Sequence, residues 1–411
     1  MQADWREITL GEFVRLQRGH DLTEGERSNG SVPVMGSAGM NGFHDVAKSS
    51  GPGVVVGRSG ASMGRIHYCP VDYWPHNTTL YVTDFLGNNI KFVYFYLSTL
   101  DLAGFNSGSA QPSLNRNYIY GIKVRVPGRN EQDAIAPTLT ALDDKIALLR
   151  ETNATLEAIA QALFKSWFVD FDPVRAKAEG REPEGIPPEI ADLFPSEFED
   201  SALGETPKGW RVGTLKDIAI LNPESWTAKK HPTTVSYIDL ANTKDNVVAN
   251  VAEYEFDEAP SRARRVLRDG DTIVGTVRPG NRSFAYIQKP PSNLTASTGF
   301  AVLRPSKVQN TDFLYLAATQ DSSIERLTHV ADGAAYPAVR PEVVVGIQCV
   351  VPSDDIMQAF HDVAAPLLSS ISKNQRQSQT LATLRDTLLP RLMSGKLRIP
   401  GVADQTEETA P

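Results

Sequence analysis

The chain contains an internal repeat, and this repeat limits its possible folds more than any other feature. A glycine at Gly108 opens a loop that reaches Pro112 and precedes an apolar segment ending at Pro127. The same pattern returns 225 residues later, from Gly333 to Pro352. A chain that repeats one pattern at a nearly fixed separation is expected to fold as two copies of one unit.

The two copies differ in length. Trp5 and Trp210, near the starts of the copies, lie 205 residues apart, so the second copy carries 20 more residues near its start. An insertion of that size is typical of a loop. With 411 residues, the chain is long enough for two domains that each have their own core.

Each copy is predicted to be a mixed, mostly β domain. Over residues 1–130, short β-branched and aromatic runs alternate with Gly, Asn and Pro turns, and one helix is predicted at 92–100. Residues 208–352 repeat this domain.

A long helix is predicted after each domain, over residues 131–171 and 353–400. In the first, apolar residues recur at spacings of four and three, which is a heptad pattern. The predicted fold class is therefore α+β, with two domains separated by an antiparallel two-helix coiled coil and related by internal two-fold pseudosymmetry. Asn153 and Asn374 would fix the register of the pair. The alternative, that each helix packs only on its own domain, stays open.

Two other segments are predicted to lie outside the domains and helices. Residues 172–207 are rich in proline and acid and are predicted to be a linker that lies over other surfaces. Residues 401–411 are predicted to be a disordered tail. The net charge of −8 comes mainly from the middle of the chain, because residues 131–204 carry 16 acidic and 6 basic side chains. Each domain is then neutral to slightly basic, which permits a local cationic face.

Composition predicts a cytoplasmic protein. Hydrophobic residues make up 41% and charged residues 22%, as in ordinary soluble proteins. No stretch approaches the roughly 20 apolar residues that a membrane span needs. The first ten residues lack the features of a signal peptide. Only Cys69 and Cys349 occur, and their spacing predicts neither a disulfide framework nor a metal site.

Each copy contains a glycine-rich loop with arginines after an apolar run, at residues 57–65 and 275–282. Glycine lets the backbone approach a phosphate or a base closely, and arginine can bind phosphate or guanine through two hydrogen bonds. A tight hairpin with solvated arginines is the alternative. The residues of these loops predicted to bind DNA are Arg58, Ser62, Arg65, Arg278, Asn281 and Arg282.

A second loop, at the repeated landmark, carries amide, hydroxyl and guanidinium groups that suit base edges in the major groove. A polar turn before a core strand is the alternative. The predicted DNA-binding residues there are Ser109, Gln111, Asn115 and Arg116 in the first copy and Tyr336 and Arg340 in the second. The exchange of Gln111 for Tyr336 fits two different targets.

The densest basic run lies in the second copy. Arg262, Arg264 and Arg265, followed by Arg268, are predicted to contact phosphates, with a solvated surface as the competing interpretation. An apolar run at the end of the first helix, Phe164, Trp167 and Phe168, is either core or a surface where a partner docks.

The search for catalytic motifs finds none. The sequence has neither a dinucleotide-binding glycine motif after a strand nor the Asn-Pro-Pro-aromatic tetrapeptide of amino-methyltransferases. The seven histidines show no metal-ligand or triad spacing. The sequence therefore predicts a protein that performs no chemistry itself.

The chain resembles the specificity subunits of type I restriction–modification enzymes. The segments LFKSWFVDF at 163–171 and LRDTLLPRLMSGK at 384–396 resemble the conserved helical regions of that family. The segments VPVMGSAG at 32–39 and VVVGRSG at 54–60 resemble recurrent motifs of its target recognition domains. The second copy matches these motifs more loosely.

The resemblance implies partners as well as a fold. Members of the family carry two target recognition domains, each of which reads half of a bipartite site in double-stranded DNA, and their helices bind two methylation subunits. Two restriction subunits complete the complex. S-adenosylmethionine, ATP and Mg²⁺ are then expected on those partners, and none of them on this chain. The alternative is a two-headed scaffold that binds protein or carbohydrate instead of DNA.

Overall fold

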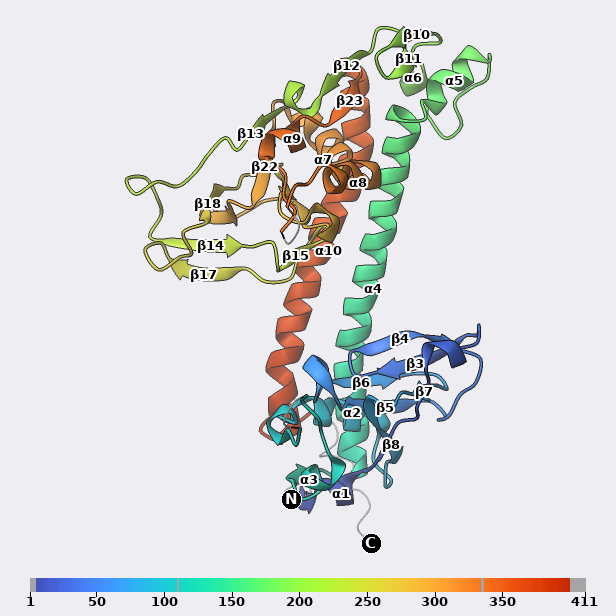
Figure 1. Ribbon diagram of the computed structural model, residues 1–411, viewed down its shortest axis with the longest axis vertical. Helices are drawn as coiled ribbons and strands as arrows, with labels where there is room; N and C mark the ends of the chain where they lie inside the picture. Colours follow the sequence, from blue (N-terminus) through green and yellow to red (C-terminus); the bar gives the residue numbers. More distant parts are fainter. Residues whose placement is uncertain (1–4, 109–110, 334–335, 400–411) are drawn as a thin grey trace. The chain divides into compact units, whose positions relative to one another are not determined.

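The structure is a computed structural model that describes residues 5–108, 111–333 and 336–399. The chain forms two compact units (Figure 1). Unit 1 comprises Met1–Leu148 with Ser378–Pro411, and unit 2 comprises Leu149–Gln377. The division falls inside two long helices, α4 (Arg129–Phe168) and α10 (Asp354–Met393), so each unit contains a domain and a part of both helices.

Unit 1 contains a four-stranded sheet in the order β2-β8-β5-β6, a three-stranded sheet β4-β3-β7 and the pair β1-β9. Strand β3 is antiparallel to β4 and parallel to β7. The elements are β1 Arg6–Thr9, α1 Leu10–Phe13, β2 Arg15–Arg18, η1 Glu24–Glu26, β3 Val32–Gly36, β4 Gly39–His44, β5 Gly53–Gly57, η2 Gly60–Ser62, β6 Ile66–Cys69, β7 Trp74–Pro75, β8 Thr79–Asp84, α2 Ile90–Ser98, η3 Ala103–Phe105, α3 Arg116–Ile119 and β9 Lys123–Val126.

The core of unit 1 lies where α2 packs against the four-stranded sheet. Strand β5 is buried along its whole length, as expected for a central strand covered on both faces. Helix α2 begins after Asn89, whose side chain accepts a hydrogen bond from the backbone N–H of Phe92. Its aromatic face, including Phe92 and Phe95, joins Leu139 of α4 and Leu392 of α10 in one apolar cluster. The helix predicted at 92–100 is therefore present and begins two residues earlier.

Unit 2 repeats this topology. Its four-stranded sheet has the order β13-β22-β19-β20, its second sheet has the order β17-β14-β21-β18, and β12 pairs with β23. The elements are β12 Arg211–Thr214, η4 Leu215–Asp217, β13 Ala219–Leu221, β14 Thr234–Ile238, β15 Thr243–Lys244, β16 Val247–Val248, β17 Ala252–Glu255, β18 Ala263–Val266, β19 Thr272–Gly275, η5 Pro279–Asn281, β20 Phe284–Tyr286, β21 Leu294–Ser297, β22 Phe300–Pro305, η6 Val308–Asn310, α7 Thr311–Thr319, α8 Asp321–His329, α9 Pro341–Val345 and β23 Gln348–Val351.

The strand pairings show that the two domains are copies. Strand β14 is antiparallel to β17 and parallel to β21, as β3 is to β4 and β7. The predicted insertion is spread over several places. Its largest part is the hairpin β15–β16, which stands between β14 and β17 where unit 1 has only residues 37–38 between β3 and β4. Strand β18 is a further addition at the edge of the sheet.

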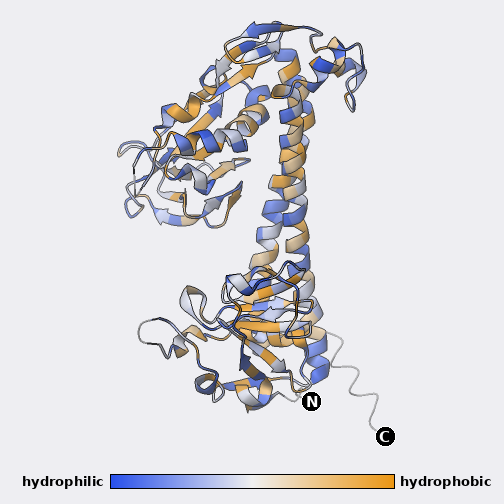
Figure 2. Cartoon of the chain, turned by 45° about the vertical axis from the view of Figure 1, so that its right-hand side comes forward, coloured by the Kyte–Doolittle hydropathy of each residue, from blue (hydrophilic) through white to orange (hydrophobic). Residues whose placement is uncertain are grey.

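The two long helices run antiparallel within each unit. In unit 2, the Asn374 Nδ2–H donates to Asn153 Oδ1 over 2.9 Å, while nearer the end of α4 the ring of Phe164 lies 6.1 Å from that of Phe360. In unit 1, Arg385 forms an ion pair with Asp143 over 2.7 Å. The helices thus pack on each other as well as on their domains, with apolar residues along the seam (Figure 2). The predicted α+β fold class is confirmed.

The segment predicted as a polar linker is folded onto unit 2. It contains α5 (Asp172–Ala178), α6 (Pro188–Ala191), β10 (Phe198–Ser201) and β11 (Gly204–Pro207). Phe194 is 2% exposed and packs edge-on against Trp167. The predicted disordered tail, 401–411, lies outside the described residues.

Of the two roles left open for the apolar run at the end of α4, the structure favours the core. Phe164, Trp167 and Phe168 are each less than 5% exposed and belong to the main apolar cluster of unit 2. The ring of Phe168 lies 4.9 Å from that of Phe360. These aromatic residues are core, so they offer no surface on which a partner could dock.

Candidate nucleic-acid interface

The glycine-rich loop of unit 1 is a tight turn between β5 and β6. A Cβ on Gly57 would lie 2.2 Å from the carbonyl oxygen of Ser62, so only glycine fits there. Gly60 and Gly64 have positive φ values of 75° and 83°. Arg58 is held by a hydrogen bond from its Nη1 to the carbonyl oxygen of Asn77, which lies between β7 and β8, at 3.0 Å. Arg65 is exposed and Ser62 is half-buried.

Backbone hydrogen bonds join this loop to the second predicted loop. The N–H of Gly60 donates to the carbonyl oxygen of Pro112 over 3.1 Å, and the N–H of Leu114 donates to that of Arg58 over 2.8 Å. The exposed Gln111 therefore lies next to the glycine-rich loop. The structure thus brings together two segments that the sequence separates by about fifty residues, from 60 to 112.

The other predicted residues of the second loop are placed less uniformly. Asn115 caps α3, accepting a hydrogen bond from the backbone N–H of Asn117. Arg116 is exposed, but its Nη1 donates to the carbonyl oxygen of Leu16 over 2.9 Å. Ser109 lies outside the described residues.

Unit 2 joins its two loops by the same bonds. The N–H of Arg278 donates to the carbonyl oxygen of Pro337 over 2.7 Å, and the N–H of Val339 donates to that of Thr276 over 2.9 Å. The guanidinium of Arg278 stacks 4.8 Å from the ring centre of Tyr336, which is 71% exposed. A flat, exposed cation–aromatic pair can stack on bases and hydrogen-bond their edges.

The remaining residues of the unit 2 loops divide into exposed and tethered groups. Asn281 and Arg340 are exposed. Arg282 forms ion pairs with Asp245 and Asp321, and the pair with Asp321 has an N–O distance of 2.7 Å. Both acids are distant in sequence, so no local pattern indicated them. A hollow of about 370 Å³ opens beside Arg282 and Asp321.

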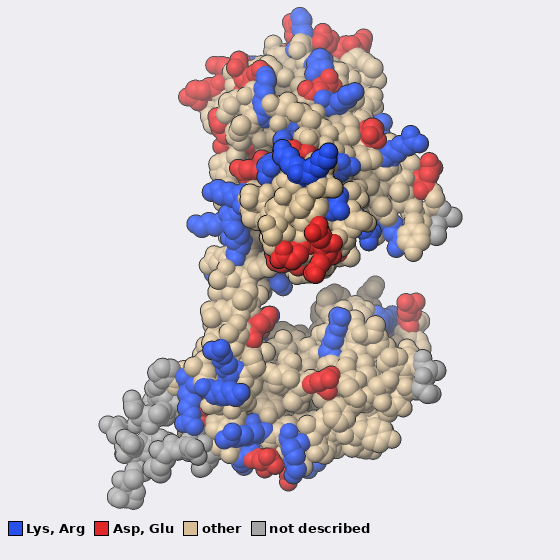
Figure 3. Space-filling model, turned by 90° about the vertical axis from the view of Figure 1, so that its left-hand side faces the viewer, with Lys and Arg blue, Asp and Glu red and all other residues tan. Residues whose placement is uncertain are grey.

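The basic run of unit 2 is not a uniform cationic surface. Arg264 stacks 4.7 Å from the ring centre of Phe256, and Arg268 forms an ion pair with Glu224 over 2.8 Å. Arg265 is half-buried, and this burial lowers the pKa of its guanidinium. Arg262 is the most exposed of the four predicted phosphate contacts. On the face drawn in Figure 3, groups of Lys and Arg on each unit alternate with acidic groups.

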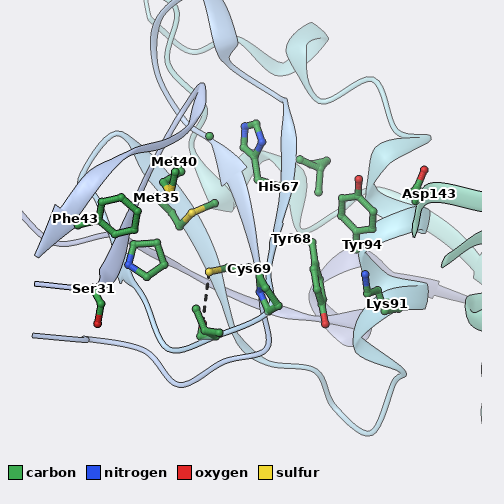
Figure 4. A pocket seen from close by; sticks show the side chains of 15 residues that line it. Ser31, Met35, Met40, Phe43, His67, Tyr68, Cys69, Lys91, Tyr94 and Asp143 are labelled. Atoms are coloured by element: carbon green, nitrogen blue, oxygen red, sulfur yellow. Dashed lines mark hydrogen bonds between the residues drawn. The ribbon is translucent and has the colours of Figure 1, made fainter. Parts of the chain in front are cut away.

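An open, mostly apolar pocket of about 650 Å³ lies between β4, β6 and α2 of unit 1 (Figure 4). Two of its reactive side chains, Cys69 and Lys91, are held by a neighbour. The Cys69 thiol donates to the carbonyl oxygen of Val71, and burial raises its pKa. The Lys91 ammonium lies 3.7 Å from the ring centre of Tyr68.

Among residues 5–108, 111–333 and 336–399, no group of three or more His, Cys, Asp or Glu side chains is placed to hold a metal ion. Within the same part of the chain, no helix combines the length and apolar character needed to cross a membrane.

Known proteins share both the sequence pattern and the fold. Residues 2–158 match the type I restriction modification DNA specificity domain. The HindI specificity subunit of Haemophilus influenzae is 27% identical over 339 residues, which cover 70% of this chain and 71% of that protein. The MjaIX specificity subunit of Methanocaldococcus jannaschii is 24% identical over 317 residues, covering 75% and 69%.

A solved structure agrees in fold. The S subunit of a type I restriction–modification system from M. genitalium superposes with a TM-score of 0.61 at 15% identity, covering 95% of this chain and 96% of that one. The duplicated domain, the paired helices and these matches lead to one conclusion: over residues 2–158 the chain is similar to the type I restriction modification DNA specificity domain, and over 70–75% of its length it is similar to type I specificity subunits.

Proposed function

We propose that each unit reads one half of a bipartite site in double-stranded DNA, and that α4 and α10 set the number of unread base pairs between the halves. One observation carries this proposal. Both units present an arginine-bearing loop that is tied to a second polar loop by the same pair of backbone hydrogen bonds. Two equivalent readers in one chain need two target segments.

The exposed side chains of these loops are the proposed DNA contacts. Arg65, Gln111 and Asn115 serve in unit 1, and the Arg278–Tyr336 pair, Asn281 and Arg340 serve in unit 2. Four other predicted residues are half-buried or are held by backbone or ion-pair contacts, and they would mainly shape the loops: Arg58, Ser62, Arg116 and Arg282. Arg262 is the leading phosphate contact of the basic run, ahead of Arg264 and Arg265.

The chain would act inside a larger complex in the cytoplasm. Two methylation subunits would supply S-adenosylmethionine, and two restriction subunits would supply ATP and Mg²⁺, while this chain supplies sequence recognition without catalysis. The buried aromatic core leaves the exposed surfaces of α4, of α10 and of the acidic segment 172–207 as the proposed docking regions. A scaffold for protein or carbohydrate has no support from the family.

A map of adenine methylation tests the proposal. Cells that express the chain with its cognate methylation subunits are compared with cells that lack the chain. We expect a new split motif, with two short half-sites around an unread spacer. Unchanged methylation, with the complex shown to assemble, would contradict the proposal.

Lengthening the helices tests the spacer. One added heptad in each helix, placed to keep the seam in phase, adds about 10 Å at 1.5 Å per residue. That length corresponds to about three base-pair steps of 3.4 Å. The spacer should lengthen by about that number while both half-sites stay the same. A change in the half-sites themselves would count against the helices as the ruler.

A further inference from the structure

The hairpin β15–β16 is the largest insertion between two corresponding strands of unit 2 and unit 1. Within the described residues 32–44, strands β3 and β4 of unit 1 are joined by residues 37–38 alone. In unit 2, the corresponding strands are 13 residues apart, at 239–251, and the hairpin turn at Asp245 and Asn246 is in the left-handed region, with φ values of 45° and 61°. Asp and Asn are the non-glycine residues that most readily adopt that conformation.

Asp245 holds the arginine-bearing loop. Its carboxylate accepts a hydrogen bond from the Nε–H of Arg282, and its N–H donates to the carbonyl oxygen of Arg282 over 2.9 Å. Arg282 itself has a φ of 59°, so the loop and the turn that grips it are both in the left-handed region. One residue of the hairpin thus binds both the side chain and the backbone of the predicted DNA-reading loop.

Asn246, the next residue, binds both long helices. Its Nδ2 donates to Glu157 Oε2 of α4 over 3.3 Å, and its carbonyl oxygen accepts from Gln375 Nε2 of α10 over 2.6 Å. Its Oδ1 accepts from the backbone N–H of Tyr286 over 2.9 Å. The residue is 7% exposed, so water cannot easily replace these bonds.

Glu157 extends the connection into the domain. Its Oε1 accepts a hydrogen bond from the Tyr315 hydroxyl of α7 over 2.6 Å, and Tyr315 is fully buried. Burial raises the pKa of the Glu157 carboxyl. A carboxylate in such a place is costly unless its partners are fixed, so the contact tolerates little displacement.

We propose that the β15–β16 hairpin is a bracket that fixes the arginine-bearing loop of unit 2 on the helix pair. Asn246 and Glu157 are its positioning residues, and they determine the spacer length at which unit 2 can read its half-site. This inference rests on the proposed function. The bracket acts through position and not through contact with DNA. Loosening it should therefore broaden the spacer preference and leave the half-site sequence unchanged.

Asn246→Asp is the sharpest perturbation. Aspartate keeps the left-handed backbone and the acceptor for Tyr286, but it replaces the donor toward Glu157 with a second carboxylate. Adding Glu157→Gln restores one donor and one acceptor with their roles exchanged. Asn293→Asp is the matched control, because Asn293 hydrogen-bonds Thr234 of β14 within the same unit.

The assay uses the complete complex with its methylation subunits and DNA substrates whose half-sites are fixed and whose spacer varies by single base pairs. Wild type and N293D should prefer one spacer. Residues in direct contact are strongly coupled. The ratio of methylation at the preferred spacer to that at neighbouring spacers should therefore fall roughly tenfold in N246D, and E157Q/N246D should return to within about threefold of the wild-type ratio. Thermal unfolding of each complex confirms assembly.

The outcomes separate the two proposals. If the wild-type complex methylates no split motif, both the proposed function and the bracket are refuted. A wild-type split motif with unchanged spacer preference in N246D, or with no rescue in the double variant, overturns the bracket alone. If N246D does not assemble, Gln375→Ala carries the test, since it removes one bond at a half-buried position. Its spacer preference should fall about threefold, and an unchanged preference overturns the bracket.

Discussion

Replacing Phe168 by alanine should destabilise unit 2, because this side chain lies at the junction of three elements. It is 4% exposed, and its ring centre lies 4.9 Å from those of both Phe313 in α7 and Phe360 in α10. The ring of Trp210 lies 5.9 Å away. The substitution would leave a cavity where helix α4, the domain and α10 meet.

The size of the effect follows from burial. Truncating a buried phenylalanine costs roughly 3–5 kcal/mol, which includes the lost aromatic contacts and the cavity. Val169, the next residue, is 46% exposed. Val169→Ala should therefore change stability by no more than about 0.5 kcal/mol. The two substitutions are at neighbouring positions in the chain, so they differ mainly in burial.

Hydrogen exchange of the α7 amides measures the loss of stability within unit 2, next to the substituted residue. A chain with two compact units need not unfold in one step, so the free energy of opening is read within unit 2. We expect F168A to lower it by several kcal/mol and V169A to leave it unchanged. If F168A exchanged like wild type but failed to bind methylation subunits, the aromatic cluster would be a docking surface after all.

Three further predictions concern the seam, the buried acid and the DNA loops. Asn153→Leu leaves the Asn374 amide without its hydrogen-bond acceptor and should lower the free energy of unfolding by about 1–2 kcal/mol. The double variant N153L/N374L should regain most of that free energy. Urea titration measures both, and an N153L variant as stable as wild type would refute the pairing. Because burial raises the pKa of Glu157 above its usual 4.5, the native state keeps this proton longer than the unfolded state, so this group's contribution to stability falls as pH rises from 4.5 through the raised value. Glu157→Gln should remove that slope from unfolding free energies measured across acidic to neutral pH, and an unchanged slope would exclude Glu157 as its source. If Arg65 neutralises a phosphate, Arg65→Ala should reduce by about 1 the slope of log K for DNA binding against the logarithm of the salt concentration. Fluorescence anisotropy with DNA measures this slope, and an unaltered slope would exclude Arg65 from the interface.

The sequence predicted which residues line the seam between α4 and α10 better than it predicted which of those residues meet. Heptad spacing placed Asn153 and Asn374 on apolar faces, because periodicity alone determines which residues share a face. It did not show that these two would meet. The repeat offset of 225 relates Asn153 to Ser378, but the hydrogen bond joins Asn153 to Asn374. Antiparallel register depends on how the domains pack against the helices, and no local pattern contains that information.

The same limit applies to the predicted DNA contacts. Composition and spacing identified the arginines, but their availability depends on acids far away in sequence. Glu224 neutralises Arg268 from 44 residues away, and Asp245 holds Arg282 from 37 residues away. A count of charges cannot separate such tethered arginines from Arg65, which the structure leaves exposed.

The two copies keep one topology while anchoring their domains to the helices by different chemistry. In unit 1, Gln132 of α4 is 1% exposed and donates to Asn88 Oδ1 over 2.8 Å, an amide–amide contact. In unit 2, the buried Asp312 carboxylate of α7 accepts from the imidazole of His361 in α10. Strand order depends on apolar alternation, which many sequences satisfy, whereas a buried polar contact requires two specific partners. Divergence between the copies therefore concentrates in polar junctions such as these and the Asn246 bracket, which are also the contacts that decide how each reading loop is held on its helices.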